Sequence, residues 1–197
     1  MKRAIALTVF VTAATMSFSW TQWAGNGHYY QIIAIDGSDY SWTTARAQAE
    51  ALVGPGGTNA YLATLTSAEE NAFVFGLADN PAYWLIDTAG NNEGPYIGAL
   101  QTPGSGEPGG GWTWVTGEAW GFTNWAPGEP NNFGGAENWG TLFGPGGVRS
   151  GLWNDVGNSP DSIIKWYVAE ADPVPEPATL AALGLGAISM LRRRRKA

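Results

Sequence analysis

At residues 125–138 the chain has the sequence WAPGEPNNFGGAEN, and at residues 153–155 it has WND. Several side chains in these two stretches end in hard oxygen atoms, among them Glu129, Asn131, Glu137, Asn154 and Asp155. Calcium takes roughly six to eight oxygen ligands in a flexible shell. These side chains could hold such an ion and leave positions open for the vicinal hydroxyls of a sugar. Composition alone leaves a second interpretation open, because Asn, Glu, Pro and Gly are also ordinary loop residues.

The segments around these stretches predict a small α+β domain. Ser41 can cap a helix over residues 42–52. A capping box formed by Ser67 and Glu70 predicts a second helix that ends near residue 78. Strands are predicted at 29–35, 61–65, 83–86 and 163–170. Residues 91–111 are rich in Gly, Pro and polar side chains, so a long irregular region is expected there.

The distribution of charge argues against one class of partner. The chain has a net charge of −7, but most of its basic residues lie near the two ends. Between the ends, Arg46, Arg149 and Lys165 stand against all 17 acidic residues, a balance of −14. Such a surface repels nucleic-acid phosphates and attracts divalent cations. Because the chain has no cysteine, its stability must come from packing, with bound metal as a further source.

The N-terminus has the pattern of a secretory signal. Lys2 and Arg3 precede an apolar run over residues 4–14, and the small residues Ser17 and Ser19 follow two positions apart. This order predicts a signal peptide over residues 1–19, with cleavage after Ser19. The apolar run is shorter than the roughly 20 residues that a membrane-spanning helix needs.

The C-terminus resembles a bacterial PEP-CTERM sorting tail. Pro175-Glu176-Pro177 precedes a short apolar stretch, and a basic cluster follows at residues 192–196. The basic cluster would stay in the cytoplasm, so the element would hold the chain at the inner membrane during export. The resemblance implies a tail over residues 173–197 that an exosortase cleaves near Pro-Glu-Pro. Transient membrane anchoring would then end in release or in attachment at the cell surface.

The central segment, residues 20–172, resembles a C-type lectin domain over nearly all of residues 29–170. Four stretches carry the resemblance besides Trp42, Ala45 and Arg46: LATLTSAEENAF at 62–73, WTWVTGE at 112–118, FTNWAPGEPNN at 122–132, and WND at 153–155. YWLIDTAG at 83–90 resembles the family's Trp-Ile-Gly-Leu core motif, with Ile86 where Gly is usual. The resemblance implies a C-type lectin-like α+β fold with two helices, small antiparallel sheets and a long irregular loop region.

The resemblance also implies a ligand set. Glu129, Asn131, Glu137, Asn154 and Asp155 stand at the positions that bind the family's principal calcium ion, and the first four also contact sugar. Pro130 is implied to follow a cis peptide bond. The Glu-Pro-Asn triplet goes with mannose- or glucose-type sugars, which have equatorial 3- and 4-hydroxyls. Auxiliary calcium positions fall on Asn132 and Asn138, which are not acids, so no second site is expected.

The usual disulfides of the family are absent. Ala49 and Ala169 stand where one cysteine pair is expected, and Trp139 and Asn158 stand where the other belongs. The two alanines of the first pair can pack in the core as small apolar residues. The second replacement is expected to leave the geometry of the binding loops to calcium and packing.

These observations predict an exported, calcium-dependent lectin of the cell surface or extracellular matrix, with exopolysaccharide or a surface glycan as its partner. The alternative is an adhesion or matrix module that binds protein, with calcium only as a brace. No enzyme is expected, because there is no thiol and no Gly-x-Ser-x-Gly elbow. Glu129 and Glu137 could serve a glycosidase in principle, but calcium explains their spacing better. His28 is expected at the surface.

Overall fold

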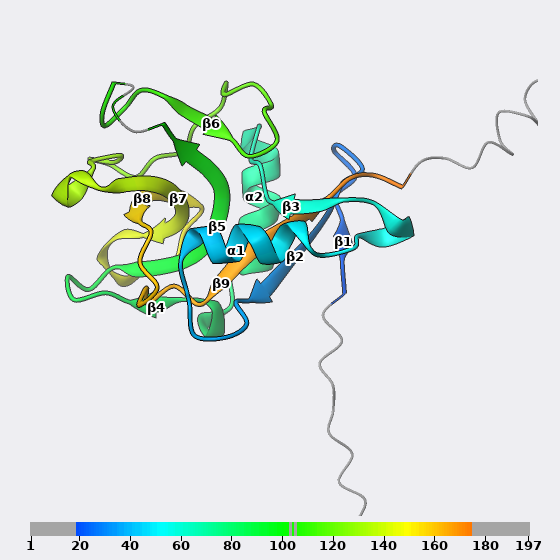
Figure 1. The fold of residues 1–197 in the computed structure, drawn as a ribbon, viewed down its shortest axis with the longest axis horizontal. Helices are drawn as coiled ribbons and strands as arrows, with labels where there is room; N and C mark the ends of the chain where they lie inside the picture. Colours follow the sequence, from blue (N-terminus) through cyan, green and yellow to red (C-terminus); the bar gives the residue numbers. More distant parts are fainter. Residues whose placement is uncertain (1–18, 103, 105, 175–197) are drawn as a thin grey trace, which may run out of the picture.

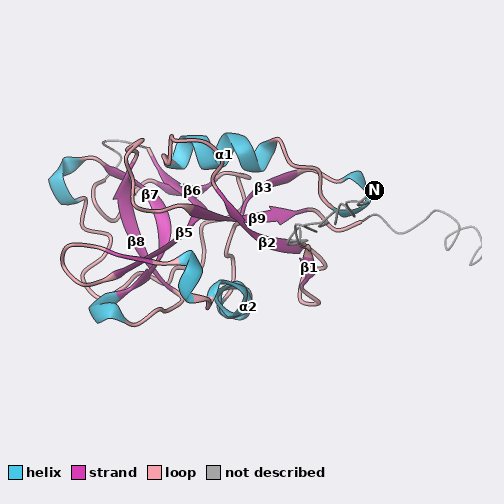
Figure 2. Cartoon of the chain, turned by 90° about the horizontal axis from the view of Figure 1, so that it is seen from below, coloured by secondary structure: helices cyan, strands magenta, loops and turns pink. Residues whose placement is uncertain are grey.

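The computed structural model describes residues 19–174 except 103 and 105. Within this part, nine strands form one sheet with the order β1-β2-β9-β5-β7-β8, while β3 pairs with β9, and β4 and β6 pair with β5. The strands are β1 (Thr21–Gln22), β2 (Tyr29–Ala34), β3 (Ala60–Leu62), β4 (Leu85–Ile86), β5 (Asn92–Gln101), β6 (Trp112–Trp114), β7 (Glu137–Gly144), β8 (Leu152–Gly157) and β9 (Trp166–Ala171). The helices are α1 (Trp42–Glu50) and α2 (Ala68–Ala78). They lie on opposite sides of the sheet (Figure 2).

Both helices begin where the sequence predicts. Ser41 accepts a hydrogen bond from the Thr44 amide at the start of α1, and Ser67 accepts one from the Glu70 amide in α2. α1 ends at Glu50, two residues earlier than expected. The predicted capping box is incomplete, because the Glu70 carboxylate accepts from the amide and hydroxyl of Thr66.

The central strand lies in the region that the sequence analysis expects to be irregular. β5 is a ten-residue strand, and Tyr96, Ile97 and Ala99 within it are fully buried. A Cβ atom on Gly98 would lie 2.5 Å from the carbonyl oxygen of Leu62, so only glycine fits this close approach of two strands. The expectation of a continuous irregular region over 91–111 is therefore wrong.

The same strand corrects the position of the core motif. Leu85 and Ile86 of β4, which the sequence analysis assigns to that motif, are exposed to solvent. Burial instead falls on residues 92–99, where Gly98 supplies the small residue that position 86 lacks. The 83–90 segment begins at the last residue of a 3-10 turn (Pro81–Tyr83) and continues as the two-residue strand β4 and a turn.

Packing and hydrogen bonds occupy the positions of the missing disulfides. Ala49 and Ala169 are fully buried in one apolar cluster. Trp139 packs against Trp42 with ring centroids 6.4 Å apart. Asn158 accepts a hydrogen bond of 3.0 Å from the backbone amide of Thr43. The second pair thus ties the end of β8 to α1, a restraint that the sequence analysis does not anticipate.

A cluster of aromatic rings surrounds Trp153 on β8. Its indole is fully buried and donates a 2.7 Å hydrogen bond to Asn71 on α2. Four other rings lie within 6.1 Å of it, centroid to centroid: Trp114, Trp120, Phe122 and Trp125. Trp153 therefore joins α2, β6 and the loop before residue 129 in one apolar unit.

The two ends of the described chain leave the domain on the same side. β2 and β9 lie next to each other and run antiparallel. Figures 1 and 2 place β1 and the end of β9 opposite to β7 and β8. Among the described residues, neither helix has the length and apolar character that spanning a bilayer requires. The predicted signal peptide and most of the predicted tail lie outside the described residues.

Replacing Trp153 with Ala should lower the free energy of unfolding by about 3–5 kcal/mol, because it leaves a cavity in this unit and leaves Asn71 Oδ1 without its donor. Trp153→Phe should cost less, since it retains a ring. Phe133→Ala is the matched control, because Phe133 is 80% exposed, and it should change stability by no more than about 0.5 kcal/mol. Chemical denaturation measures all three. A loss below 1 kcal/mol for Trp153→Ala would contradict this account of the cluster.

Candidate functional site

Pairing of β7 with β8 brings together two parts of the predicted site. Glu137 begins β7, and Asn154 and Asp155 lie on β8 opposite Thr141 and Gly140. The loop that carries Glu129 is held against β8, since the Ala126 amide donates to the Trp153 carbonyl at 2.9 Å. The Glu129–Pro130 peptide bond is cis, as the resemblance implies.

Next to these residues is a pocket of about 380 Å³. It lies at the end of the domain where β4, β7 and β8 are labelled in Figure 1. Four of the five predicted ligands line it: Glu129, Asn131, Glu137 and Asn154. Its other lining residues are Asp87, Thr88, Ala89, Asn91, Glu93, Phe133, Phe143 and Val156.

Asp155 lies behind the pocket and holds its loop. The side chain is fully buried, and its two carboxylate oxygens accept the backbone amides of Asn131 at 2.9 Å and Asn132 at 2.7 Å. Glu137 closes the same loop, because its carboxylate accepts the amide of Phe133 at 2.7 Å. Asn132 itself has a left-handed backbone with φ of 48°. Both acids therefore shape the loop.

The carboxylates of the pocket are crowded. Burial, followed by the negative charge of Asp155, raises the pKa of Glu129 to about 7. Burial also raises the pKa of Glu137 to about 7, although the hydrogen bond from the Phe133 amide opposes the shift. Groups of this kind gain from a bound cation, since a positive charge favours their ionised form.

Glu93 is a pocket acid that the sequence analysis misses. It lies on β5 and is 8% exposed. Burial, and then the charges of Asp87, Glu137 and Glu129, raise the pKa of Glu93 to about 8, while a hydrogen bond from Asn154 opposes the shift. The signal that could have located it is the apolar run at 96–100, which marks a buried strand and places Glu93 at its start.

Unpartnered oxygens gather at this pocket. Glu93 Oε2, Glu129 Oε2 and Asn154 Oδ1 are buried and have no hydrogen-bond partner. Gln101, Trp114 and Asn138 also have such an atom but do not line the pocket. Buried polar atoms are normally paired, so three open acceptors in one pocket suit a cation or a hydroxyl-bearing ligand. Among the described residues, no three His, Asp or Glu side chains are grouped as a metal site by themselves.

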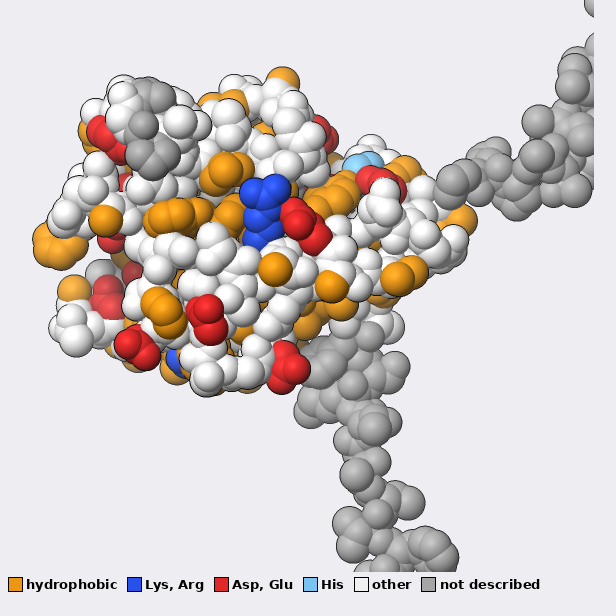
Figure 3. All heavy atoms as spheres, viewed as in Figure 1, with side chains coloured by type: hydrophobic (Ala, Val, Ile, Leu, Met, Phe, Trp, Pro, Cys, Tyr) orange, Lys and Arg blue, Asp and Glu red, His pale blue; other side chains and the backbone are white. Residues whose placement is uncertain are grey.

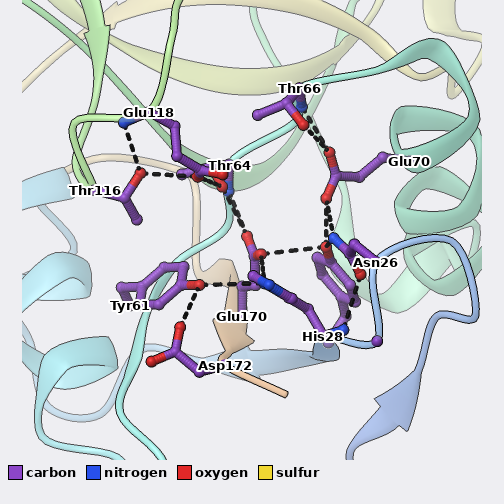
Figure 4. Close-up of polar contacts among 12 residues, drawn as sticks. Asn26, His28, Tyr61, Thr64, Thr66, Glu70, Thr116, Glu118, Glu170 and Asp172 are labelled. Atoms are coloured by element: carbon purple, nitrogen blue, oxygen red, sulfur yellow. Dashed lines mark hydrogen bonds and ion pairs between the residues drawn. The ribbon is translucent and has the colours of Figure 1, made fainter.

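A second polar cluster, drawn in Figure 4, differs from the pocket in being satisfied internally. Glu170 is 1% exposed, pairs with His28, and accepts the Thr64 amide at 2.8 Å. Glu70, also 1% exposed, accepts from Tyr30 and from Asn26. None of the described buried side-chain atoms in this cluster lacks a partner.

His28 is not the free surface residue that the sequence analysis expects. Its side chain is 19% exposed, and the hydrogen bond to Glu170 raises its pKa, against the opposing effect of burial. This contact attaches the start of β2 to β9. The second cluster is therefore a structural link rather than an open site.

The surface of the described domain carries few cations. Figure 3 shows acidic side chains scattered over one face, with Lys and Arg covering only small areas. Arg46 pairs with Glu50, and Arg149 pairs with Asp79. This arrangement offers no extended basic surface to a nucleic acid.

Comparison with known proteins agrees with the fold. The PEP-CTERM protein-sorting motif matches residues 173–196. The hepatic lectin of Gallus gallus is 28% identical over 142 residues, which cover 71% of this chain and 53% of that protein. The chain thus spans about half the length, or less, of the curated relatives it matches.

Two solved structures share the fold. The C-type lectin CEL-I from Cucumaria echinata superposes with a TM-score of 0.54 and 22% identity, covering 82% of this chain and 99% of that one. The cow C-type carbohydrate-recognition domain of CD23 superposes with a TM-score of 0.52 and 22% identity, covering 79% and 95%. The chain is therefore a C-type lectin-fold domain followed by a PEP-CTERM protein-sorting motif.

Proposed function

We propose that this protein binds carbohydrate at the cell surface through a calcium ion held by Glu129, Asn131, Glu137, Asn154 and Asp155. The observation that carries the proposal is the pocket with open acceptor atoms on Glu129 and Asn154. The relatives named as lectins support the same class of ligand. When bound, calcium would supply a positive centre that attracts two vicinal sugar hydroxyls.

The side chains of the pocket determine which hydroxyls fit. A carboxylate can only accept a hydrogen bond, whereas an amide NH₂ group donates. Glu129 and Asn131 flank Pro130, so an acceptor and a donor stand on either side of it. This order suits mannose- or glucose-type sugars, with their equatorial 3- and 4-hydroxyls.

The position of the pocket supports a surface role. The chain leaves the described domain after Val174, on the side opposite to β7 and β8 (Figure 1). An attachment at that end would leave the pocket facing outward. Exopolysaccharide or another surface glycan is the partner we propose, with an exosortase acting on the tail.

Without calcium, the stability of the domain should fall as the pH rises from 5 to 8. The pKa values of Glu93, Glu129 and Glu137 lie above the ordinary value of 4.5, at about 8, 7 and 7. The folded state therefore binds more protons than the unfolded state in this range, and rising pH removes that stabilisation. Calcium should reduce this fall and raise the melting temperature. At 100 times its dissociation constant, the gain would be about 2.7 kcal/mol.

Thermal unfolding in EDTA and in millimolar calcium, across this pH range, measures both effects. The raised pKa values of His28 and Glu170 act in the same direction in EDTA, so Glu129→Gln combined with Glu137→Gln is the informative variant. It should weaken the pH dependence and the response to calcium together. Identical melting curves of the wild-type protein in calcium and EDTA would rule out the metal site.

Exchanging donor and acceptor at the pocket should change sugar preference. Glu129→Gln with Asn131→Asp keeps the size, the oxygen atoms and the summed charge of the pair. The hydrogen-bond directions are reversed, so preference should move from mannose or glucose toward galactose. A glycan array with the wild-type and exchanged proteins, with and without EDTA, measures the change.

Asp155→Ala should abolish binding of every sugar, because it removes a proposed ligand and frees the amides of Asn131 and Asn132. Asp36→Ala removes an exposed carboxylate elsewhere and should bind normally. Glycan binding that survives EDTA would replace this proposal with the alternative, an adhesion module that contacts protein.

Processing of the tail gives an independent test of localisation. The sorting motif over residues 173–196 should be cleaved near Pro175-Glu176-Pro177 in the native host. Mass spectrometry of the surface-exposed protein should then find no peptide from Leu180 onward. Recovery of residues 192–196 in the mature product would contradict the proposed sorting.

A further inference from the structure

One wall of the pocket comes from a hairpin that supplies none of the proposed calcium ligands. β4 pairs with the start of β5, with Leu85 opposite Glu93. Glu93 also pairs with Phe143 on β7, so the hairpin lies directly beside the strand that begins at Glu137. The side chains that it contributes to the pocket are Asp87, Thr88, Ala89, Asn91 and Glu93.

Of the two acids on this wall, only Glu93 has an open acceptor. Asp87 accepts the amides of Ala89 and Asn91 at 2.8 Å each and the Asn91 side chain at 3.1 Å. Glu93, in contrast, is more than nine-tenths buried, and its Oε2 atom has no partner. A buried carboxylate oxygen in this state is costly unless a ligand supplies a donor.

The described part of the protein offers no cation to Glu93. None of its basic side chains lines the pocket. Each is engaged elsewhere: Arg46 with Glu50, Arg149 with Asp79, His28 with Glu170, and Lys165 with the Tyr40 ring and the Ser162 carbonyl.

The charge of one divalent ion does not neutralise all the carboxylates at the pocket. The proposed calcium ligands include the three carboxylates of Glu129, Glu137 and Asp155, which exceed the charge of the ion by one. Glu93 adds to this excess when it is ionised, and the charges of Glu129 and Glu137 act on it. A ligand with a positive group is therefore favoured over a neutral one, and a negative one is disfavoured.

We propose that the pocket prefers sugars with a free ammonium group, such as 2-amino sugars without an acetyl group, and that Glu93 recognises this group. The inference rests on the proposed function, since calcium would hold the sugar hydroxyls while Glu93 accepts a hydrogen bond from the ammonium. An ammonium has three donors and a full charge, and its bond to a carboxylate is charge-assisted. The volume of about 380 Å³ is within the usual range for small-ligand pockets.

Four monosaccharides of one ring configuration test the preference. Glucosamine, glucose, N-acetylglucosamine and glucuronate share equatorial 3- and 4-hydroxyls, so the proposed calcium contact is the same for all. Calorimetry with the wild-type protein in millimolar calcium should show glucosamine binding about tenfold more tightly than glucose or N-acetylglucosamine. Glucuronate should bind most weakly. The difference in affinity between glucosamine and glucose should become smaller at high salt, because salt screens the attraction between the ammonium group and the carboxylates.

Glu93→Gln should remove the preference for glucosamine, so that this variant binds glucosamine and glucose with affinities within about twofold of each other. Gln keeps the shape of the side chain and removes a buried charge, so the fold should persist, as thermal unfolding can verify. Glu69→Gln is the matched control, because Glu69 is an exposed acid on α2, and the preference should be unchanged in it. The wild-type comparison among the four sugars tests the proposal without any variant.

The outcomes separate this inference from the proposed function. If glucose binds in calcium but not in EDTA, and glucosamine binds no better, the preference is refuted while the lectin function stands. A preference that survives Glu93→Gln refutes the role of Glu93. Binding of two calcium ions per chain would show that a second metal ion, rather than an ammonium group, neutralises the negative charge of Glu93. If no sugar binds, both proposals fail.

Discussion

The packing of β8 is the constraint on which the binding end of this domain depends. Trp153 is buried among aromatic rings from β6 and from the segment that follows it. Two positions further on, Asp155 is buried on the same side of the strand and holds the amides of the loop at 131–132. Asn154, between them, faces the pocket. One short strand thus anchors the apolar cluster, fixes the loop and presents an oxygen, which explains how the loops are ordered without a disulfide.

The two groups of buried acids show opposite solutions to the cost of burying charge. Glu70 and Glu170 are surrounded by tyrosine, threonine and histidine donors, so the folded protein itself satisfies them. Glu93 and Glu129 keep open oxygens in a pocket that no basic side chain of the described domain reaches. A protein retains such a costly arrangement where a ligand completes it. The contrast separates a structural cluster from a site.

Local signals in the sequence were sufficient for some elements and misleading for others. Ser41 and Ser67 cap the helices as predicted, because a cap depends on residues only a few positions apart. β5 was missed because its Gly and Pro residues resemble a loop. Gly98 is needed only because the backbone near Leu62 approaches it closely, and that contact joins segments more than thirty residues apart. For the same reason the core motif was assigned to residues 83–90, although the buried run around Gly98 occupies that place in the structure.

For the site, the sequence by itself determined the acidic character of the domain, and its resemblance to C-type lectins supplied the proposed ligands. Only the tertiary structure decided that Asp155 lies behind the pocket while four other candidates line it. It also added the wall with Glu93, because pairing of β4 with β5 and of β5 with β7 places that acid opposite Phe143 in the same pocket. The negative charge that stays unpaired in the pocket depends on which side chains are brought together by strand pairing. No local sequence pattern determines those contacts.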